Sequence, residues 1–176
     1  ARDLGTLPGY SASVAEDINN HGQVAGTSYT DIGISSEDKQ HASLWEKGHW
    51  QDMGTLPGFH YSMSWAINDR GEVVGHVSTG DSSKDHAFLW RDGKMQDLNT
   101  LIPQASGWML KDATGINNRG QIIGGGLHNG KKANCLLTPH QSSLPKPHPL
   151  PRIEMPSRYL PEIYPIYDKS VQNHGC

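Results

Sequence analysis

The chain has 176 residues, 35% hydrophobic and 19% charged, and a formal net charge of −3 at pH 7. This length fits one modest globular domain, and the scattered lysines and arginines do not form the basic face that nucleic-acid binding needs. The sequence predicts no membrane span, because it contains no run of 18 apolar residues.

The chain opens with the motif DLGTLPG at residues 3–9, which returns as DMGTLPG at 52–58 and in degenerate form as DLNTLIP at 97–103. Elsewhere this motif comes after three other segments of a repeat. We therefore interpret residues 3–7 as a lone fourth strand. Because Asp3, Asp52 and Asp97 begin equivalent segments, we expect them to act as structural caps or turns.

A pentad Ile-Asn-x-x-Gly marks three repeats, and its copies lie 49 residues apart at 18–22, 67–71 and 116–120. A short apolar run ending in Gly follows each pentad. This pattern predicts two strands joined by a tight turn, because Asn tolerates a left-handed backbone and Gly accepts positive φ without a steric penalty.

The third strand of each repeat is predicted from HASLW at 41–45, HAFLW at 86–90 and the degraded copy ANCLL at 133–137. The turn sequences EKG at 46–48 and RDG at 91–93 predict hairpins to the fourth strand. All these runs are short and rich in Val, Ile, Trp and Thr, which favours strands over helices.

The sequence thus predicts an all-β domain over residues 1–137. Its repeats cover about 10–56, 57–101 and 104–137, with the N-terminal strand at 3–7. Residues 138–176 hold eight of the eleven prolines and lack the repeat. They predict an extended Pro-rich arm. This arm has enough apolar residues to dock on the β domain of its own chain or on a partner chain.

The motifs DLGTLPG, AINDRGEVVG at 66–75 and HAFLW resemble the HAF-type repeats of bacterial extracellular proteins, from about residue 3 to about 137. The third copy departs from this pattern, with Ala133, Asn134 and Cys135 in place of His-Ala-Phe. The resemblance implies a secreted or periplasmic, propeller-like β module and implies no activity.

The register of the repeats predicts a closed ring, in which the N-terminal strand pairs with the sheet formed by residues 113–137 and so removes unpaired edges. Three blades are too few for a propeller, so we expect a homodimer with six blades. A three-fold barrel of β-trefoil type is the alternative.

Tryptophans at unmatched repeat positions are predicted to form an exposed binding surface, namely Trp50, Trp65 and Trp108, whereas the matched pair Trp45 and Trp90 is predicted to be core. Loops that differ between the repeats are the second expected source of binding residues. Their carboxylates are Asp31, Glu37, Asp81 and Asp85.

No nucleophile elbow, phosphate-binding glycine loop or closely spaced His pair occurs in the sequence. We therefore predict a non-catalytic module that binds a glycan or a protein, without cofactor or metal. The alternative is a hydrolase or lyase in which the loop carboxylates act as acid and base. Cys135 and Cys176 are predicted to form a disulfide if the protein is exported.

Overall fold

The structure is a computed structural model and describes residues 1–30 and 39–140. The chain divides into two compact units, Ala1–Ser143 and Leu144–Cys176. The second unit, which covers most of the predicted Pro-rich arm, lies outside the described residues. The first unit contains strands and three short 3-10 helices but no α-helix among the described residues, so the all-β prediction is confirmed.

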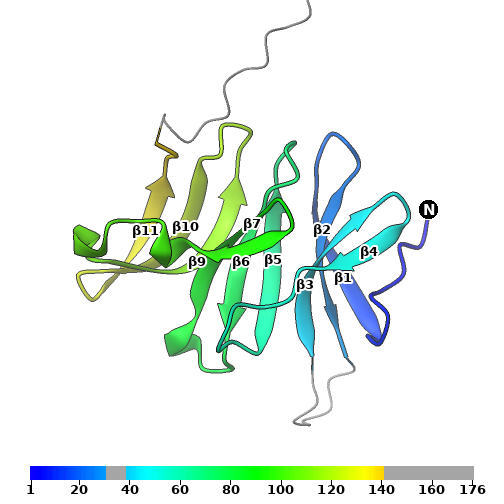
Figure 1. Cartoon of the computed structure of the whole chain (residues 1–176), viewed down its shortest axis with the longest axis horizontal. Coiled ribbons are helices and arrows are strands. Elements are labelled where there is room, and N and C mark those ends of the chain that lie inside the picture. The colour runs from blue at the N-terminus through cyan, green and yellow to red at the C-terminus, as the bar shows by residue number, and fades with distance from the viewer. Residues whose placement is uncertain (31–38, 141–176) are drawn as a thin grey trace, which may run out of the picture. The chain divides into compact units, whose positions relative to one another are not determined.

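Three antiparallel groups of strands lie side by side in the first unit, one for each repeat (Figure 1). The first two groups are joined in one eight-stranded sheet, and the third is a separate three-stranded sheet. We call these groups the first, second and third sheets. The first consists of β1 (Ala12–Ile18), β2 (Val24–Tyr29), β3 (Gln40–Glu46) and β4 (His49–Asp52). The second consists of β5 (Tyr61–Ile67), β6 (Val73–Ser78), β7 (His86–Arg91) and β8 (Lys94–Asp97). The third consists of β9 (Trp108–Ile116), β10 (Ile122–His128) and β11 (Lys131–Leu137). The 3-10 helices are η1 (Ser82–Lys84), η2 (Leu98–Thr100) and η3 (Gln104–Ser106).

The predicted turns are present. Each Asn-x-x-Gly pentad closes the hairpin between the first two strands of its repeat, with the Gly at φ of 75°, 73° and 73° at Gly22, Gly71 and Gly120. In the third repeat a two-residue turn at Asn129 and Gly130 joins β10 to β11, where the other two repeats have longer loops. Such Asn-Gly turns suit a tight hairpin because both residues take positive φ.

The first two sheets are connected by a single parallel bridge between Gln40 and Tyr61, and the third sheet has the order β11-β10-β9. Neither strand path closes on itself within the described residues. The ring is therefore not closed within this part of the chain.

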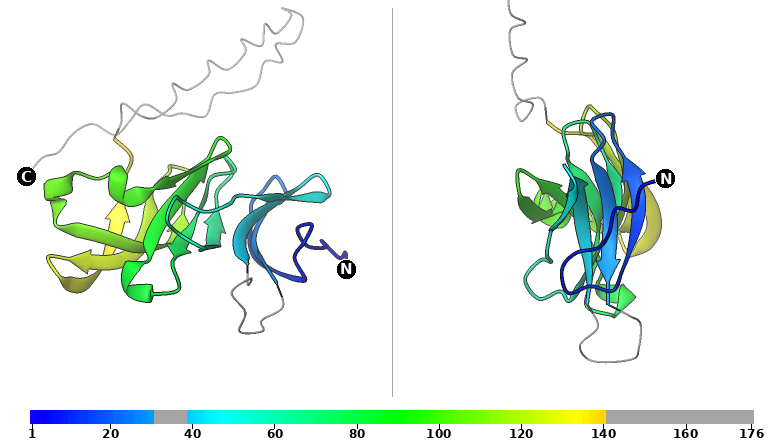
Figure 2. Two further views of the ribbon diagram at one scale, coloured as in Figure 1. Left: turned by 60° about the horizontal axis from the view of Figure 1, so that its bottom comes forward. Right: turned by 90° about the vertical axis from the view of Figure 1, so that its right-hand side faces the viewer.

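The N-terminal segment corrects one prediction, because residues 3–7 are not a strand and do not pair with the third sheet. They lie against the first repeat (Figure 2). There the carbonyl of Gly5 accepts hydrogen bonds from Ser13 Oγ at 2.8 Å and Trp50 Nε1 at 2.9 Å. Leu7 is buried there against Val24 and Trp50.

The second copy of the motif explains this placement. The Gly54 carbonyl accepts a hydrogen bond from Ser62 Oγ at 2.6 Å, just as the Gly5 carbonyl accepts one from Ser13. Leu56 packs against the apolar cluster between the first and second repeats. Gly5 and Gly54 both take positive φ two residues after an Asp, and at Gly54 this turn leads the chain away from β4, which ends at Asp52. DLGTLPG is thus a link that packs on the repeat that follows it.

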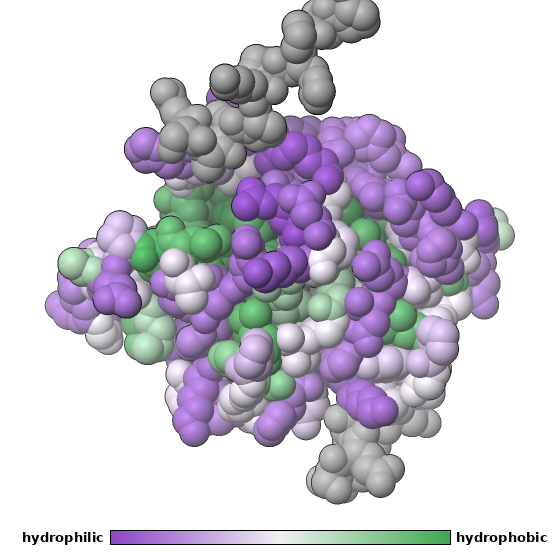
Figure 3. Space-filling model, viewed as in Figure 1, coloured by the Kyte–Doolittle hydropathy of each residue, from purple (hydrophilic) through white to green (hydrophobic). Residues whose placement is uncertain are grey.

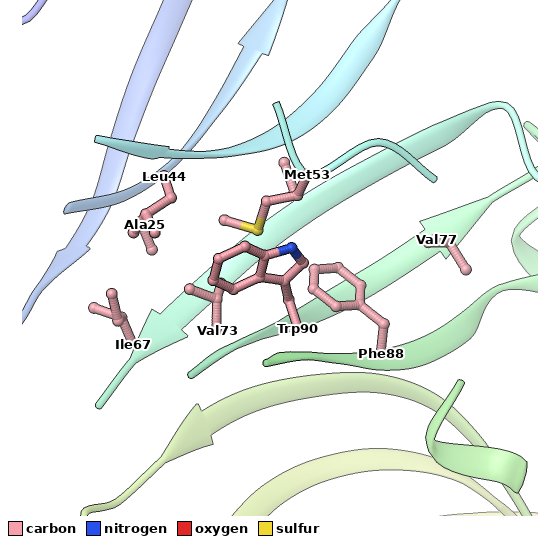
Figure 4. Close-up of a cluster of buried hydrophobic side chains, with 9 residues drawn as sticks. Ala25, Leu44, Met53, Ile67, Val73, Val77, Phe88 and Trp90 are labelled. Atoms are coloured by element: carbon pink, nitrogen blue, oxygen red, sulfur yellow. The ribbon is translucent and has the colours of Figure 1, made fainter. Parts of the chain in front are cut away.

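The core lies between the repeats. One apolar cluster joins the first and second repeats (Figure 4), where Met53 and Trp90 lie together between the two ribbons. A second cluster joins the second and third repeats through residues such as Val74, Leu89 and Leu110. Trp90 is buried as predicted, and Trp45 packs against the cluster around Leu7.

The repeated His and Asp form structural pairs. His41 Nδ1 lies 3.0 Å from the Asp52 carboxylate and His86 Nδ1 lies 2.7 Å from Asp97 Oδ2. Asp52 Oδ1 also accepts the N–H of Gly54 at 2.7 Å, as expected for a turn residue. Burial opposes ionisation of Asp52, but hydrogen bonds from His41 and Gly54 outweigh it, so the pKa of Asp52 is lowered.

Candidate functional site

The candidate site lies where the second repeat meets the third. Trp65 comes from β5, His76 from β6, Asp85 from the end of the β6–β7 connection and Asp112 from β9. We name these four residues the His76 cluster. It sits beside the second apolar core cluster, so strand packing between the two repeats holds its members in place.

Trp65 and His76 form a stacked pair. Their ring centroids are 5.9 Å apart with an interplanar angle of 25°, and Trp65 Nε1 donates a hydrogen bond to His76 Nδ1 at 3.1 Å. Indole nitrogen is only a donor, so Nδ1 must act as the acceptor. The imidazole proton of neutral His76 is therefore on Nε2, which leaves one N–H donor for another partner.

Burial lowers the pKa of His76, and the nearby carboxylates of Asp85 and Asp112 oppose this shift only in part. Removal from water disfavours the charged imidazolium, so His76 is neutral at pH 7. Oδ1 of Asp85 and Oδ1 of Asp112 are both buried and have no hydrogen-bond partner within the described chain. The cluster thus presents two carboxylate acceptors beside one neutral histidine.

A shallow pocket opens next to Asp112 in the third sheet. Its lining includes Lys111, Asp112, Gly125, Leu127, Lys132 and Asn134. Gly125 belongs to this lining, and the nearest atoms that a Cβ added there would meet are Asp112 Oδ2, Asn134 Oδ1 and the Ala133 carbonyl oxygen, each at 3.9 Å. Glycine at position 125 thus leaves the space beside Asp112 Oδ2 and Asn134 Oδ1 unfilled.

Two neighbouring features fix the pocket walls. A Cβ on Gly126 would lie 2.1 Å from the carbonyl oxygen of Met109, so glycine is required for the close pairing of β10 with β9. Lys111 Nζ donates hydrogen bonds to the carbonyls of Ser82 and Ser83 at 3.1 and 2.8 Å. These bonds tie the β6–β7 connection of the second repeat to β9.

Two of the residues predicted from sequence, Trp65 and Asp85, come together in the His76 cluster. Asp81 is exposed and accepts the backbone N–H of Ser83 at the start of η1, and hydrogen bonds from Ser83 lower the pKa of Asp81. It is a capping residue in this structure. Asp31 and Glu37 lie outside the described residues.

The other two predicted tryptophans have different surroundings. Trp50 is only 8% exposed and packs with Leu7 and Val24, so it contributes to the core and not to an exposed surface. Trp108 is half-buried against the second apolar cluster and stacks on His128, with ring centroids 4.7 Å apart at 16°.

The predicted disulfide is not formed in the described chain. Cys135 is a half-buried free thiol, and Cys176 lies outside the described residues. Burial raises the pKa of the Cys135 thiol, which keeps this cysteine protonated and poorly nucleophilic.

His76, Asp112, Asn134 and Gly125 were missed by the sequence interpretation. Their signal was the departure of the third repeat from the pattern. Ala133 and Asn134 stand where the second repeat has His86 and Ala87, and the apolar run of the third repeat continues into three glycines at 124–126.

No group of three or more His, Cys, Asp or Glu side chains among the described residues is placed to hold a metal ion. Within the same residues no helix has the length and apolar character to cross a membrane.

A comparison with protein-family models gives no match, and comparisons with curated proteins and with solved structures give none either.

Proposed function

We propose that this chain is a non-catalytic binding module and that its ligand is a glycan held in the pocket between Asp112 and Asn134. The observation that carries the proposal is the Asp112 carboxylate, whose Oδ2 lies beside Gly125 in the pocket lining while its Oδ1 is buried without a hydrogen-bond partner. A carboxylate with one oxygen buried and unpaired is poorly solvated, so a ligand hydroxyl that donates to Oδ2 gains more than it would at a fully exposed carboxylate.

The pocket lining suits a hydroxyl-rich ligand. Asp112 supplies acceptors, Asn134 supplies both a donor and an acceptor, and Lys132 supplies donors at the rim. Leu127 and Ala133 add an apolar contact for the C–H face of a sugar ring. The neutral His76 behind Asp112 adds no charge to the site at pH 7.

The resemblance to HAF-type repeats supports a secreted or periplasmic location and a propeller-like assembly, and both belong to this proposal. The alternative, a hydrolase or lyase, would need an acid and a base. Asp85 and Asp112 beside His76 are the described groups that fit this need best.

A glycan array followed by calorimetry on the strongest hit tests the proposed function. Asp112→Asn and Gly125→Leu should each weaken binding about tenfold or more, because the first weakens an acceptor and the second places a bulky side chain in the pocket lining. Asp81→Asn, an exposed loop carboxylate that does not line the pocket, is the matched control and should bind as the unmodified chain does.

If the ligand is a protein, the glycan array should show no binding. Asp112→Asn and Gly125→Leu should then weaken the binding of a protein partner. Turnover of a chromogenic esterase or glycosidase substrate, abolished by Asp85→Asn, would replace the binding-only function with catalysis.

A further inference from the structure

The hairpin turns of the three repeats are connected by a ladder of hydrogen bonds. Asn19 Nδ2 donates to the carbonyl of Asn68 at 3.0 Å, and Asn68 Nδ2 donates to the carbonyl of Asn117 at 3.1 Å. Each bond spans 49 positions, so the same side chain contacts the same atom of the next repeat. We call this series the Asn ladder.

A second set of bonds runs beside it, one residue further along the chain. The backbone N–H of Asn20 donates to Asp69 Oδ1 at 2.9 Å, and the backbone N–H of Asp69 donates to Asn118 Oδ1 at 2.8 Å. The Arg70 guanidinium also donates to the Asn118 carbonyl. The Asn ladder and these backbone N–H bonds all point from one repeat toward the next, whereas Asn118 Nδ2 donates back to Asp69 Oδ2 at 2.7 Å.

The last repeat has the donors of this ladder but no acceptors within the described chain. The Asn117 amide nitrogen bonds only Gln121 Oε1 of its own turn, at 2.8 Å. The backbone N–H of Asn118 and the guanidinium of Arg119, which is equivalent to Arg70, have no acceptor among the described residues. All three residues are exposed.

The first repeat has the opposite set. The Asn19 carbonyl accepts only the N–H of Gly22 within the described chain, whereas the Asn68 and Asn117 carbonyls each accept an Asn side chain as well. Asn20 Oδ1 receives no hydrogen bond there, although its equivalents Asp69 Oδ1 and Asn118 Oδ1 do. The free donors of the third repeat match the free acceptors of the first.

Exposed apolar residues lie on the same two repeats, the third and the first. Ile123 is 53% exposed and Leu136 is 61% exposed, whereas their equivalents Val74 and Leu89 are 0% and 7% exposed in the contact with the next repeat. Figure 3 shows apolar surface on the side of the first unit where β10 and β11 lie. At the other end Ile18 is 64% exposed and its equivalent Ile67 is 5% exposed.

We propose that the outer face of the third repeat docks on the first repeat of a second copy of this chain, as the second repeat docks on the third within one copy. Asn117 Nδ2 then donates to the partner's Asn19 carbonyl, the N–H of Asn118 donates to the partner's Asn20 Oδ1, and Ile123 and Leu136 cover the partner's Ile18. The contact is heterologous, and two identical contacts join two copies in a closed ring of six repeats.

Light scattering coupled to size exclusion tests the proposal on the full chain. The unmodified protein should have twice the chain mass of 19.3 kDa at micromolar concentration. Leu136→Asp and Asn117→Ala should each weaken the association about tenfold or more, because each removes a contact that the interior repeats make. Both residues are exposed in one chain, so the far-ultraviolet circular dichroism spectrum should stay unchanged.

Leu101→Asp is the matched control, since Leu101 is 52% exposed and lies in the link between the second and third sheets. It should leave the association constant unchanged. A single-chain mass at all concentrations would overturn the proposal. This mass is the result expected if another segment of the same chain covers the outer face of the third repeat. A larger assembly, or equal effects of Leu101→Asp and Leu136→Asp, would also overturn it.

Discussion

The second and third repeats contain the same Asn-x-x-Gly turn and the same strand order but differ in what lies next to them. Val74 and Leu89 of the second repeat are buried against the third, whereas the equivalent Ile123 and Leu136 are more than half exposed. The difference shows that the apolar pattern of this sequence encodes the contact between repeats. A single sheet does not bury its own apolar residues, because each one needs a neighbour.

Replacement of a glycine at the centre of a repeat should have the largest effect. A Cβ on Gly75 would lie 1.8 Å from the carbonyl oxygen of Met63, so Gly75→Ala should lower the free energy of unfolding by about 3 kcal/mol or more. Gly125→Ala in the third repeat meets only ordinary contacts and should change it by less than about 0.5 kcal/mol. Urea denaturation followed by tryptophan fluorescence measures both. Equal stability of the two variants would refute the assignment of Gly75 to a close strand contact.

Truncation of the leucine in the HAFLW motif should have the next largest effect. Leu89→Ala should cost about 2–4 kcal/mol, because Leu89 is buried in the second apolar cluster. Leu136→Ala should cost less than about 0.5 kcal/mol at nanomolar protein concentration, where the proposed assembly has dissociated. A large loss for Leu136→Ala under these conditions would mean that its face is covered within one chain.

The Asn ladder gives a third matched pair. Asn68 is buried and donates to both Glu72 Oε2 and the Asn117 carbonyl. Asn68→Ala should cost about 1–3 kcal/mol, because it leaves buried acceptors without a donor. Asn117→Ala should cost less in a single chain, about 0.5–1 kcal/mol, because its side chain bonds only exposed groups of its own turn. Thermal unfolding of both variants checks the difference, and similar melting temperatures would contradict the role of the ladder.

The smallest effect concerns pH and separates the second repeat from the others. Burial lowers the pKa of His76 below its ordinary value of 6.5, against the opposing carboxylates of Asp85 and Asp112. Between the lowered pKa of His76 in the folded chain and its ordinary pKa in the unfolded chain, the unfolded chain binds more protons. The free energy of unfolding therefore rises with pH in this interval. This contribution is complete above about pH 6.5 and is lost on acidification.

His76→Gln should therefore flatten the pH dependence of stability just below pH 6.5. The lowered pKa of Asp52 also contributes stability that acid removes, but in a lower interval, below its ordinary value of 3.8. Urea unfolding at closely spaced pH values distinguishes the two intervals. An unchanged profile in His76→Gln would show that the buried histidine does not set this dependence.

Strand order and turns could be predicted because they follow from local chemistry. Asn and Gly at fixed offsets define the hairpins, and the short apolar runs between them fit only strands. The placement of residues 3–7 could not be predicted this way. A segment of that composition fits either an added strand or a link, and only the packing of Leu7 against Val24 and Trp50 distinguishes the two.

The candidate site was accessible from sequence only in part. Trp65 and Asp85 stood out because they differ between repeats, and the structure places them in one cluster with His76. Trp50 stood out for the same reason but fills the space that Met95 occupies in the second repeat, so it belongs to the core. Asp112 has no distinguishing neighbours in the sequence, since its significance comes from its cross-strand partner Gly125.

The central claim is that the third repeat of one chain docks on the first repeat of a second copy. A cysteine cross-link tests this claim most directly. In a background with Cys135→Ala and Cys176→Ser, the pair Asn20→Cys and Asp69→Cys should link within one chain, because these residues are hydrogen-bonded neighbours. The pair Asn20→Cys and Asn118→Cys should instead give a covalent two-chain species on a non-reducing gel. A two-chain band that appears on oxidation and disappears on reduction is the predicted result; efficient linkage in the first pair with only single chains in the second would contradict it.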